Sequence, residues 1–300
     1  MNIIDPHLHL FDLEQGEYHW LKPENPPFWS DKSIINKSFS EKHLQLTNEL
    51  TLAGFVHIEA GYDNHQPWRE IAWLEAHCQL PFKSIAAIDL SLNSEQFLAS
   101  IARIQNFSSV VGVRDILDDN ALEYLSNEQI KINFQQLAKH QLIFELQMPL
   151  ENLAAVELLV AILTDNPSLN VIINHAGFPP YTSPIKDEKS NTEDTKENTQ
   201  HWKNWQQAIE KLSFFEQCTI KCSGFEMINR NYHTAWQIKV IKTCLKYFGI
   251  NRVMLASNFP LCLFSKSYQT YWQQITQSEL FRDDELNILC FLNTQRIYKF

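Results

Sequence analysis

The chain contains eight short, β-rich apolar runs, and most of them are followed by a segment of helical periodicity. Eight runs have the composition of strands: residues 2–4, 55–60, 84–90, 110–114, 142–147, 170–174, 218–222 and 252–256. Helical spacing follows in residues 68–77, 94–105, 127–139, 151–163, 202–212, 234–248 and 283–298. Ser94 is the expected N-cap of its helix and Gly249 the glycine that ends another. Eight strands that alternate with helices in 300 residues predict an α/β fold, the (β/α)₈ barrel.

An open, doubly wound parallel sheet is the rival architecture. It normally carries a glycine-rich phosphate turn after its first strand. Here that turn is H-L-H-L-F-D, without glycine, which favours the barrel. We predict a single barrel domain over residues 1–300. Residues 181–201 are polar and charged throughout, so we predict a mobile insertion there.

The first strand leads into Asp5-Pro6-His7-Leu8-His9-Leu10-Phe11-Asp12. Alternate side chains of an extended chain share a face, so His7 and His9 are expected to point the same way. Two imidazoles at a strand end can hold one metal ion or one anionic group of a substrate.

Polar residues stand at or just after the end of every predicted strand. They are His7 and His9, Glu59 (with His57 on its face), Asp89, Arg114 and Asp115, Glu145 and Gln147, Asn174 and His175, Lys221 and Ser223, and Ser257 and Asn258. A barrel carries its active site at these carboxyl ends, and buried polar groups destabilise a fold unless they are paired. Three of the seven glycines, Gly61, Gly177 and Gly224, also follow predicted strands. A shared site explains the pattern better than packing does.

Composition and charge limit the kinds of partner that the chain can bind. A net charge of −10 argues against nucleic acid and an anionic membrane surface, and no run of 18 apolar residues is present to span a bilayer. No secretory signal is visible, and the six scattered cysteines form no C-x-x-C pair, so we expect reduced thiols in a cytoplasmic protein. The long aromatic loop over residues 16–40 has the length of a lid.

Several segments, in order along nearly the whole chain, resemble the amidohydrolase superfamily, in the branch of barrel hydrolases with 2-pyrone-4,6-dicarboxylate lactonase and the sugar-acid lactonases. They are D-P-H-L-H-L-F-D at 5–12, Y-H-W-L at 18–21, H-I-E-A at 57–60, G-V-R-D at 112–115, N-H-A-G-F-P at 174–179, I-K-C-S-G-F at 220–225, R-V-M-L-A-S-N-F-P at 252–260 and N-T-Q-R-I-Y at 293–298.

The resemblance implies a metallo-dependent-hydrolase-like barrel that hydrolyses a small, anionic lactone or related carboxylic ester with an activated water. His7, His9 and His175 match the superfamily's metal ligands, so it implies one divalent metal, zinc foremost, or none, since some members of the branch work without one. The usual eighth-strand aspartate, the base that activates water, is Asn258 here, and an amide takes up no proton near neutral pH.

Within this resemblance, His175 is expected to act as acid or base and Asn258 to orient water or substrate. Arg114, Glu59, Gln147 and Lys221 are expected to bind a small-molecule substrate. Two alternatives stay open: a metal-dependent decarboxylase of the same superfamily, and a catalytically impaired binding barrel.

Overall fold

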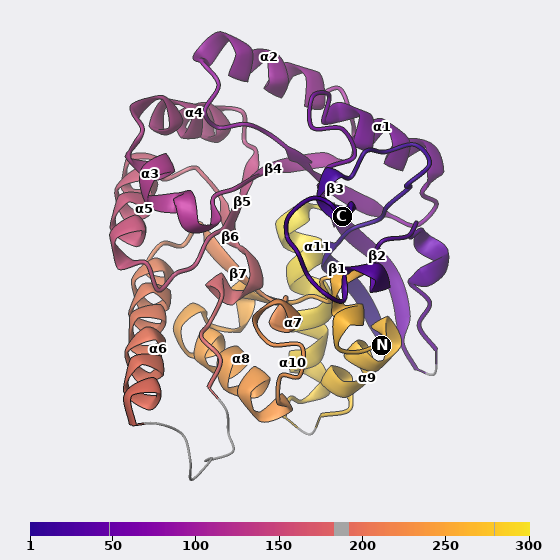
Figure 1. The fold of residues 1–300 in the computed structure, drawn as a ribbon, viewed down its shortest axis with the longest axis vertical. Coiled ribbons are helices and arrows are strands. Elements are labelled where there is room, and N and C mark those ends of the chain that lie inside the picture. The colour runs from indigo at the N-terminus through magenta and orange to yellow at the C-terminus, as the bar shows by residue number, and fades with distance from the viewer. Residues whose placement is uncertain (48, 183–191, 279) are drawn as a thin grey trace.

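In the computed structural model, eight parallel strands lie side by side in the order in which they occur along the chain (Figure 1). The structure describes residues 1–47, 49–182, 192–278 and 280–300, without the side chains of 192–198. The strands are β1 (Asn2–Leu8), β2 (Thr51–Ile58), β3 (Phe82–Ala87), β4 (Val110–Ile116), β5 (Ile143–Gln147), β6 (Val171–Ile173), β7 (Cys218–Cys222) and β8 (Val253–Leu255).

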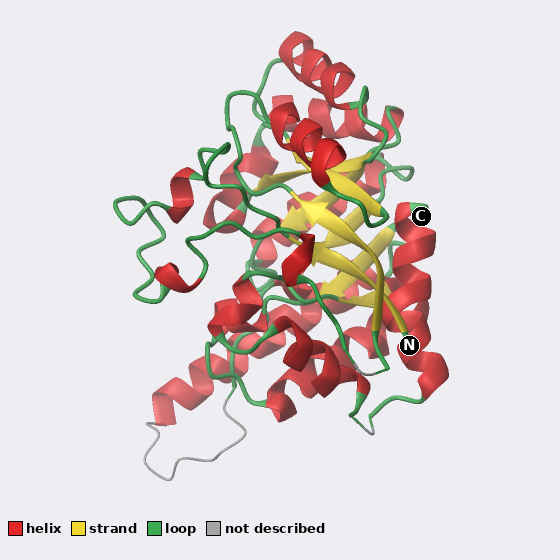
Figure 2. Ribbon diagram, turned by 90° about the vertical axis from the view of Figure 1, so that its right-hand side faces the viewer, coloured by secondary structure: helices red, strands yellow, loops and turns green. Residues whose placement is uncertain are grey.

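Helices connect the strands and pack around the outside of the sheet (Figures 1 and 2). They are α1 (Trp68–His77), α2 (Ser94–Ile104), α3 (Ala121–Ser126), α4 (Glu128–Lys139), α5 (Leu153–Asp165), α6 (Thr192–Ser213), α7 (Phe225–Ile228), α8 (Thr234–Phe248), α9 (Tyr268–Thr276), α10 (Asp283–Asn287) and α11 (Asn293–Tyr298). Parallel neighbours need such crossovers, because a tight hairpin joins only antiparallel strands.

The sheet curls so that its first and last strands meet. A single parallel bridge joins Leu8 to Phe259. The amide of His9 donates to the carbonyl of Phe259 (2.7 Å), and the amide of Asn258 donates to the carbonyl of His7 (3.0 Å). The fold is therefore a nearly closed (β/α)₈ barrel, which confirms the predicted fold and excludes the open sheet.

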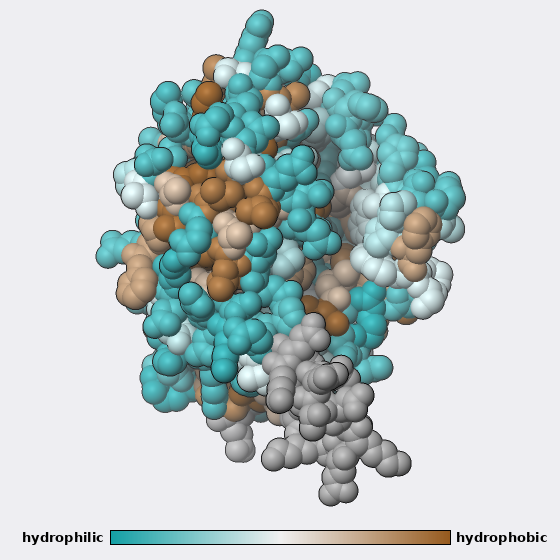
Figure 3. Space-filling model, turned by 60° about the vertical axis from the view of Figure 1, so that its left-hand side comes forward, coloured by the Kyte–Doolittle hydropathy of each residue, from teal (hydrophilic) through white to brown (hydrophobic). Residues whose placement is uncertain are grey.

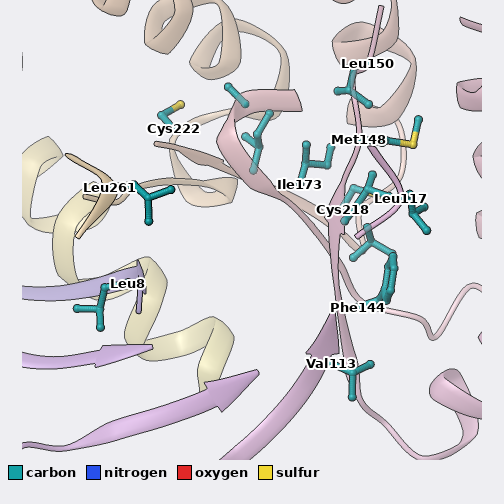
Figure 4. Packing of buried hydrophobic residues seen from close by; sticks show 14 of the residues in the cluster. Leu8, Val113, Leu117, Phe144, Met148, Leu150, Ile173, Cys218, Cys222 and Leu261 are labelled. Atoms are coloured by element: carbon teal, nitrogen blue, oxygen red, sulfur yellow. The ribbon is translucent and has the colours of Figure 1, made fainter. Parts of the chain in front are cut away.

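Strand side chains divide between the barrel interior and the helix layer. The inner cluster contains Val56, Ile58, Ile85, Ile143, Ile172, Met254 and Tyr298. The larger cluster packs against the helices, and Figure 4 shows some of its members, among them Val113, Phe144 and Ile173. Between the inner cluster and the carboxyl ends, the Lys221 ammonium donates to both carboxylate oxygens of Glu145 (2.6 and 2.7 Å), and both side chains are fully buried.

Most element predictions agree with the structure, and the differences are local. The N-cap of α2 is Asn93, whose side chain accepts from the amide of Gln96, so the prediction of Ser94 was wrong by one residue. Gly249 ends α8 with φ of 70° as expected. Of the predicted insertion at 181–201, residues 183–191 lie outside the described residues, and 192–201 form the beginning of α6.

The surface turned to the viewer in Figure 3 is mostly hydrophilic, with one gathering of hydrophobic side chains and a hollow beside it. No helix among the described residues is long and apolar enough to cross a membrane. The six cysteines are free thiols, and all but Cys78 are buried.

Candidate active site

A cavity of about 700 Å³ opens at the carboxyl ends of the barrel strands. Its lining includes His9 after β1, Glu59 after β2, Arg114 of β4, Gln147 of β5, His175 after β6 and Asn258 after β8. The structure thus brings together side chains that are up to 249 positions apart in the sequence, from His9 to Asn258. This is the end of the barrel where (β/α)₈ enzymes bind substrates.

The loop over residues 16–40 supplies one wall of this cavity through Trp20, Pro26, Pro27 and Trp29. The indole N–H of Trp20 donates to the carbonyl of Ala60 at 2.7 Å, which ties the loop to the end of β2. Arg230, after α7, pairs with Asp31 of the loop (2.9 Å) and lies over the rings of Trp29 and Phe264. The loop therefore forms a lid with apolar, aromatic walls, in agreement with its sequence.

Three histidines meet beneath and beside the cavity. His7 lies 4.6 Å from His175 and 5.2 Å from His9 between ring centroids. Nδ1 of His7 donates to Oδ1 of Asn174 (3.2 Å) and Nδ1 of His9 donates to the carbonyl of Ile58 (2.8 Å). Both bonds fix the tautomer that leaves a lone pair on Nε2. In His7 this Nε2 atom is buried and has no hydrogen-bond partner among the described residues.

Burial keeps these imidazoles neutral. It lowers the pKa of His7 and of His9 well below the usual value, and nearby cationic groups act in the same direction. The pKa of His175 falls to about 3, because burial, Arg114 and Lys221 all disfavour the imidazolium. At neutral pH each ring can accept a proton but holds it weakly.

The backbone around His175 and Asn258 is strained. His175, Ala176 and Asn258 have φ of 52°, 51° and 59°, in the left-handed region that side chains with a Cβ adopt at a free-energy cost. Nδ1 of His175 lies 3.0 Å from Oγ of Ser223, and a Cβ on Gly224 would lie only 2.4 Å from the same nitrogen. Gly224, with φ of 65°, therefore makes room for His175.

Arg114 is largely satisfied by protein groups. Its Nε donates to Oε1 of Glu59 (2.7 Å), Nη2 to the carbonyl of Glu59 (2.8 Å) and Nη1 to Oε1 of Gln147 (2.9 Å). The guanidinium has five N–H donors, so the terminal nitrogens keep donors for a ligand. Glu59 neutralises its charge, and Asp118 brings a further carboxyl group to the cavity.

The other predicted site residues differ in their access to the cavity. Glu59 and Gln147 line it, whereas Lys221 is fully buried below it and bound to Glu145. His57 does not share the site of Glu59, because its Nε2 meets Oε1 of Glu70 on α1 (3.1 Å). The prediction that His57 and Glu59 share a face was wrong. β2 ends at Ile58, and the regular alternation of side chains ends with the strand.

One buried acid at the site was missed from the sequence. Glu226 in α7 accepts a hydrogen bond from Nδ2 of Asn258 at 2.6 Å, and both side chains are almost completely buried. Burial raises the pKa of Glu226 to about 7. The motif I-K-C-S-G-F ends one residue before it, and the sequence signal was a glutamate two positions after a strand-end glycine.

The metal implied by the resemblance can be tested against these side chains. The buried Nε2 of His7, with a second ring nitrogen held by Asn174, is the kind of donor that zinc prefers. However, within the described ranges no group of three or more His, Cys, Asp or Glu side chains is placed to hold an ion. The residues do not fit a metal in this arrangement.

Comparison with known proteins gives the family context. A family model described as amidohydrolase matches residues 4–300. The uncharacterized protein y4mH of Sinorhizobium fredii is 26% identical over 282 residues, covering 90% of this chain and 89% of the relative.

Solved structures of similar fold include proteins named as hydrolases and proteins named as decarboxylases. An amidohydrolase from Burkholderia multivorans, solved with bound zinc, has a TM-score of 0.74 at 16% identity and covers 100% and 99% of the two chains. A putative 2-pyrone-4,6-dicarboxylic acid hydrolase from Pseudomonas putida has a TM-score of 0.64 at 16% identity, with coverage of 99% and 97%. A 5-carboxyvanillate decarboxylase from Sphingomonas paucimobilis has a TM-score of 0.59 at 11% identity, with 99% of each chain covered. These likenesses concern the fold.

Proposed function

Because this chain belongs to the amidohydrolase family, we propose that it is an enzyme that hydrolyses an uncharged lactone or related carboxylic ester with an activated water. The supporting observation is the cavity at the carboxyl ends of the strands, where His175, Asn258 and Arg114 face one space. This set offers a proton acceptor, an acceptor for water and a donor for a carbonyl oxygen, which are the groups that acyl transfer to water requires.

The roles follow from hydrogen-bonding capacity. The remaining N–H groups of Arg114 would donate to the carbonyl oxygen of the substrate and stabilise the negative charge that develops there. Oδ1 of Asn258, which has no partner among the described residues, would accept a hydrogen bond from the attacking water. The water oxygen bonds to the carbonyl carbon as His175 accepts a proton from the water. The acyl C–O bond of the ring then breaks, and the ring oxygen takes that proton from His175 to give a hydroxy acid.

His175 is our proposed proton acceptor. Its low pKa keeps it unprotonated at neutral pH, which is the form a base needs, but makes it a weak base at rest. Negative charge developing on the substrate would favour the imidazolium, so proton transfer would accompany attack rather than precede it.

The charge balance of the cavity leads us to propose an uncharged ring in place of the anionic substrate expected from the sequence. The positive charge of Arg114 is neutralised by Glu59, and Asp118 adds a carboxyl group to the lining. The lid contributes Trp20 and Trp29, whose faces suit the C–H surface of a ring. The same balance disfavours decarboxylation of an aromatic acid, which needs a free cation for the carboxylate.

The test is hydrolysis of a panel of neutral γ- and δ-lactones by wild-type protein, by His175→Ala and by Asn258→Asp, followed as release of acid. We expect turnover by wild type and a loss of about 10²–10⁴ in kcat for His175→Ala. Full activity in His175→Ala contradicts the assignment of the base, and absence of turnover of any lactone contradicts the function. A large gain in Asn258→Asp would support the impaired-hydrolase alternative. The zinc favoured by the sequence resemblance stays a prediction, checked by elemental analysis of the purified protein.

A further inference from the structure

Glu226 reaches Asn258 because of the turn that follows β7. Gly224 has φ of 65° and directs the chain into α7, a helix of four residues. Glu226 lies in this helix with 1% of its surface exposed, next to Asn258, which is equally buried. Backbone bonds hold Asn258 on both sides: its amide donates to the carbonyl of His7, and its carbonyl accepts from the amide of Cys262 (3.2 Å).

The hydrogen bond between the two side chains is directional. A carboxylate only accepts, so the group of Asn258 that faces Glu226 at 2.6 Å must be the donor, Nδ2. Oδ1 of Asn258 is consequently turned away from Glu226. It is buried and has no hydrogen-bond partner among the described residues, although Asn258 lines the cavity.

We propose that Glu226 is the positioning residue for Asn258: its carboxylate fixes the carboxamide so that Oδ1, and not Nδ2, faces the attacking water. This inference rests on the proposed function. A carboxamide is nearly symmetric in shape, and rotation by 180° would exchange the two atoms. With Nδ2 on the cavity side, Asn258 would donate to the water oxygen and occupy the lone pair that attacks the substrate.

The orientation is specified only while Glu226 is ionised, because a protonated carboxyl group can donate to Oδ1 as readily as it accepts from Nδ2. Burial raises the pKa of Glu226 to about 7, against the hydrogen bond from Asn258 and the charges of Arg230 and Lys266, which lower it. The other titratable groups that face it are Cys262, Tyr232 and Tyr271. Activity should therefore fall as the pH drops through neutrality.

The experiment compares wild type, Glu226→Gln and the control Asp115→Asn on whichever neutral lactone wild type turns over. Asp115 is also a carboxyl group whose pKa burial raises, to about 6, but it accepts from the amide of Leu90 and is absent from the cavity lining. We expect Glu226→Gln to lower kcat about 10- to 100-fold with KM nearly unchanged, the range for loss of an outer partner of a reacting group. Its kcat should lose the acidic limb near pH 7, whereas Asp115→Asn should keep it. An unchanged kcat, or a limb retained in Glu226→Gln, would overturn the proposal.

A second variant reverses the pair. In Asn258→Asp two carboxyl groups would face each other, whereas the double variant Asn258→Asp with Glu226→Gln restores an amide–carboxylate hydrogen bond. We expect the double variant to exceed Asn258→Asp in kcat by at least about tenfold, and equal activities would contradict the proposal.

If wild type hydrolyses no lactone, the proposed function fails independently of this inference. Infrared difference spectra of wild type minus Glu226→Gln then test the pair directly. A carboxyl band that titrates near pH 7 supports the proposal, and its absence between about pH 5 and pH 9 refutes it.

Discussion

At the scale of single residues, the site depends on two residues whose backbone conformations are rare for non-glycine residues. Non-glycine residues with positive φ persist only where the surroundings over-determine them, and His175 and Asn258 are both of this kind. The backbone at these two positions therefore serves the placement of their side chains, and the neighbours that permit it are sensitive to small changes.

Gly224→Ala tests this dependence. The added Cβ would lie 2.4 Å from Nδ1 of His175 in a residue with φ of 65°, so His175 must move. We expect a loss of about 1–3 kcal/mol in the free energy of unfolding and a kcat reduced by tenfold or more. Gly249→Ala is a matched control, because Gly249 has φ of 70° but no described atom lies within 4 Å of where an added Cβ would stand. It should lose stability by strain alone and keep kcat; equal kcat values in the two variants would contradict the role of Gly224.

Glu226 also makes a prediction about stability. Its pKa rises from the ordinary 4.5 to about 7 on folding, so the folded state binds a proton that the unfolded state releases between these values. The stability contribution of this proton is fully present below about pH 4.5. The folded wild-type protein loses up to about 3 kcal/mol of stability as the pH rises through 7. Glu226→Gln lacks this loss, so its Tm relative to wild type should be higher at about pH 8.5 than at pH 5. Thermal melts at the two pH values measure the difference, and parallel shifts would contradict the assigned titration.

At the scale of secondary-structure elements, the strands were predictable because period-2 and period-3.6 patterns are local properties of the sequence. The short α7 was not predicted, since four residues carry no period. Contacts such as Glu59 with Arg114, 55 residues apart, or Glu226 with Asn258, 32 apart, depend on how the strands are arranged in the barrel. Sequence reasoning could therefore place His7, Arg114 and His175 at strand ends, but could not show that the charge of Arg114 is neutralised.

An ion pair between Arg230 and Asp31 is one of the contacts that hold the lid. Arg230→Met keeps much of the stacking on Trp29 and Phe264. It loses the ion pair with Asp31 and also the hydrogen bond from Nη1 to the carbonyl of Glu226 (2.6 Å). The side chains of Arg230 and Asp31 are about one-quarter exposed, so we expect loss of their ion pair to weaken the closed lid by ~0.5–1 kcal/mol. This loss should appear as a KM raised about threefold, with a smaller effect on kcat. Arg282→Met, which breaks an exposed pair with Asp284, should change neither constant. A KM unaffected in Arg230→Met would show that the pair does not hold the lid.

At the scale of the whole molecule, the barrel has a polar centre within an apolar interior. Lys221 of β7 and Glu145 of β5 form a fully buried ion pair, and the hydroxyl of Tyr298 in α11 donates to the same carboxylate at 2.5 Å. This network connects β5 and β7, which flank β6, with the last helix. We therefore expect it to support the site from below the cavity.

Lys221→Met should therefore act mainly on stability. Removing one partner leaves a buried carboxylate uncompensated, which costs about 3–5 kcal/mol, and the double variant Lys221→Met with Glu145→Gln should recover part of it. Denaturant unfolding of the single and double variants measures both values. A stable Lys221→Met protein with a raised KM would instead identify Lys221 as a substrate ligand.

The meeting of β1 and β8 has a consequence for the motions of the barrel. Seven strand pairs share ladders, whereas this junction, as far as the described residues show, holds a single bridge and the amide bonds of His9 and Asn258. Both residues also line the cavity, so a ligand that occupies it would fasten the junction from within. Native-state hydrogen–deuterium exchange should find these two amides among the fastest of the buried backbone, slowed by a bound lactam analogue far more than amides of the β4–β5 ladder. The junction between β1 and β8 would then be the least stable part of the barrel, and the bound ligand would stabilise it.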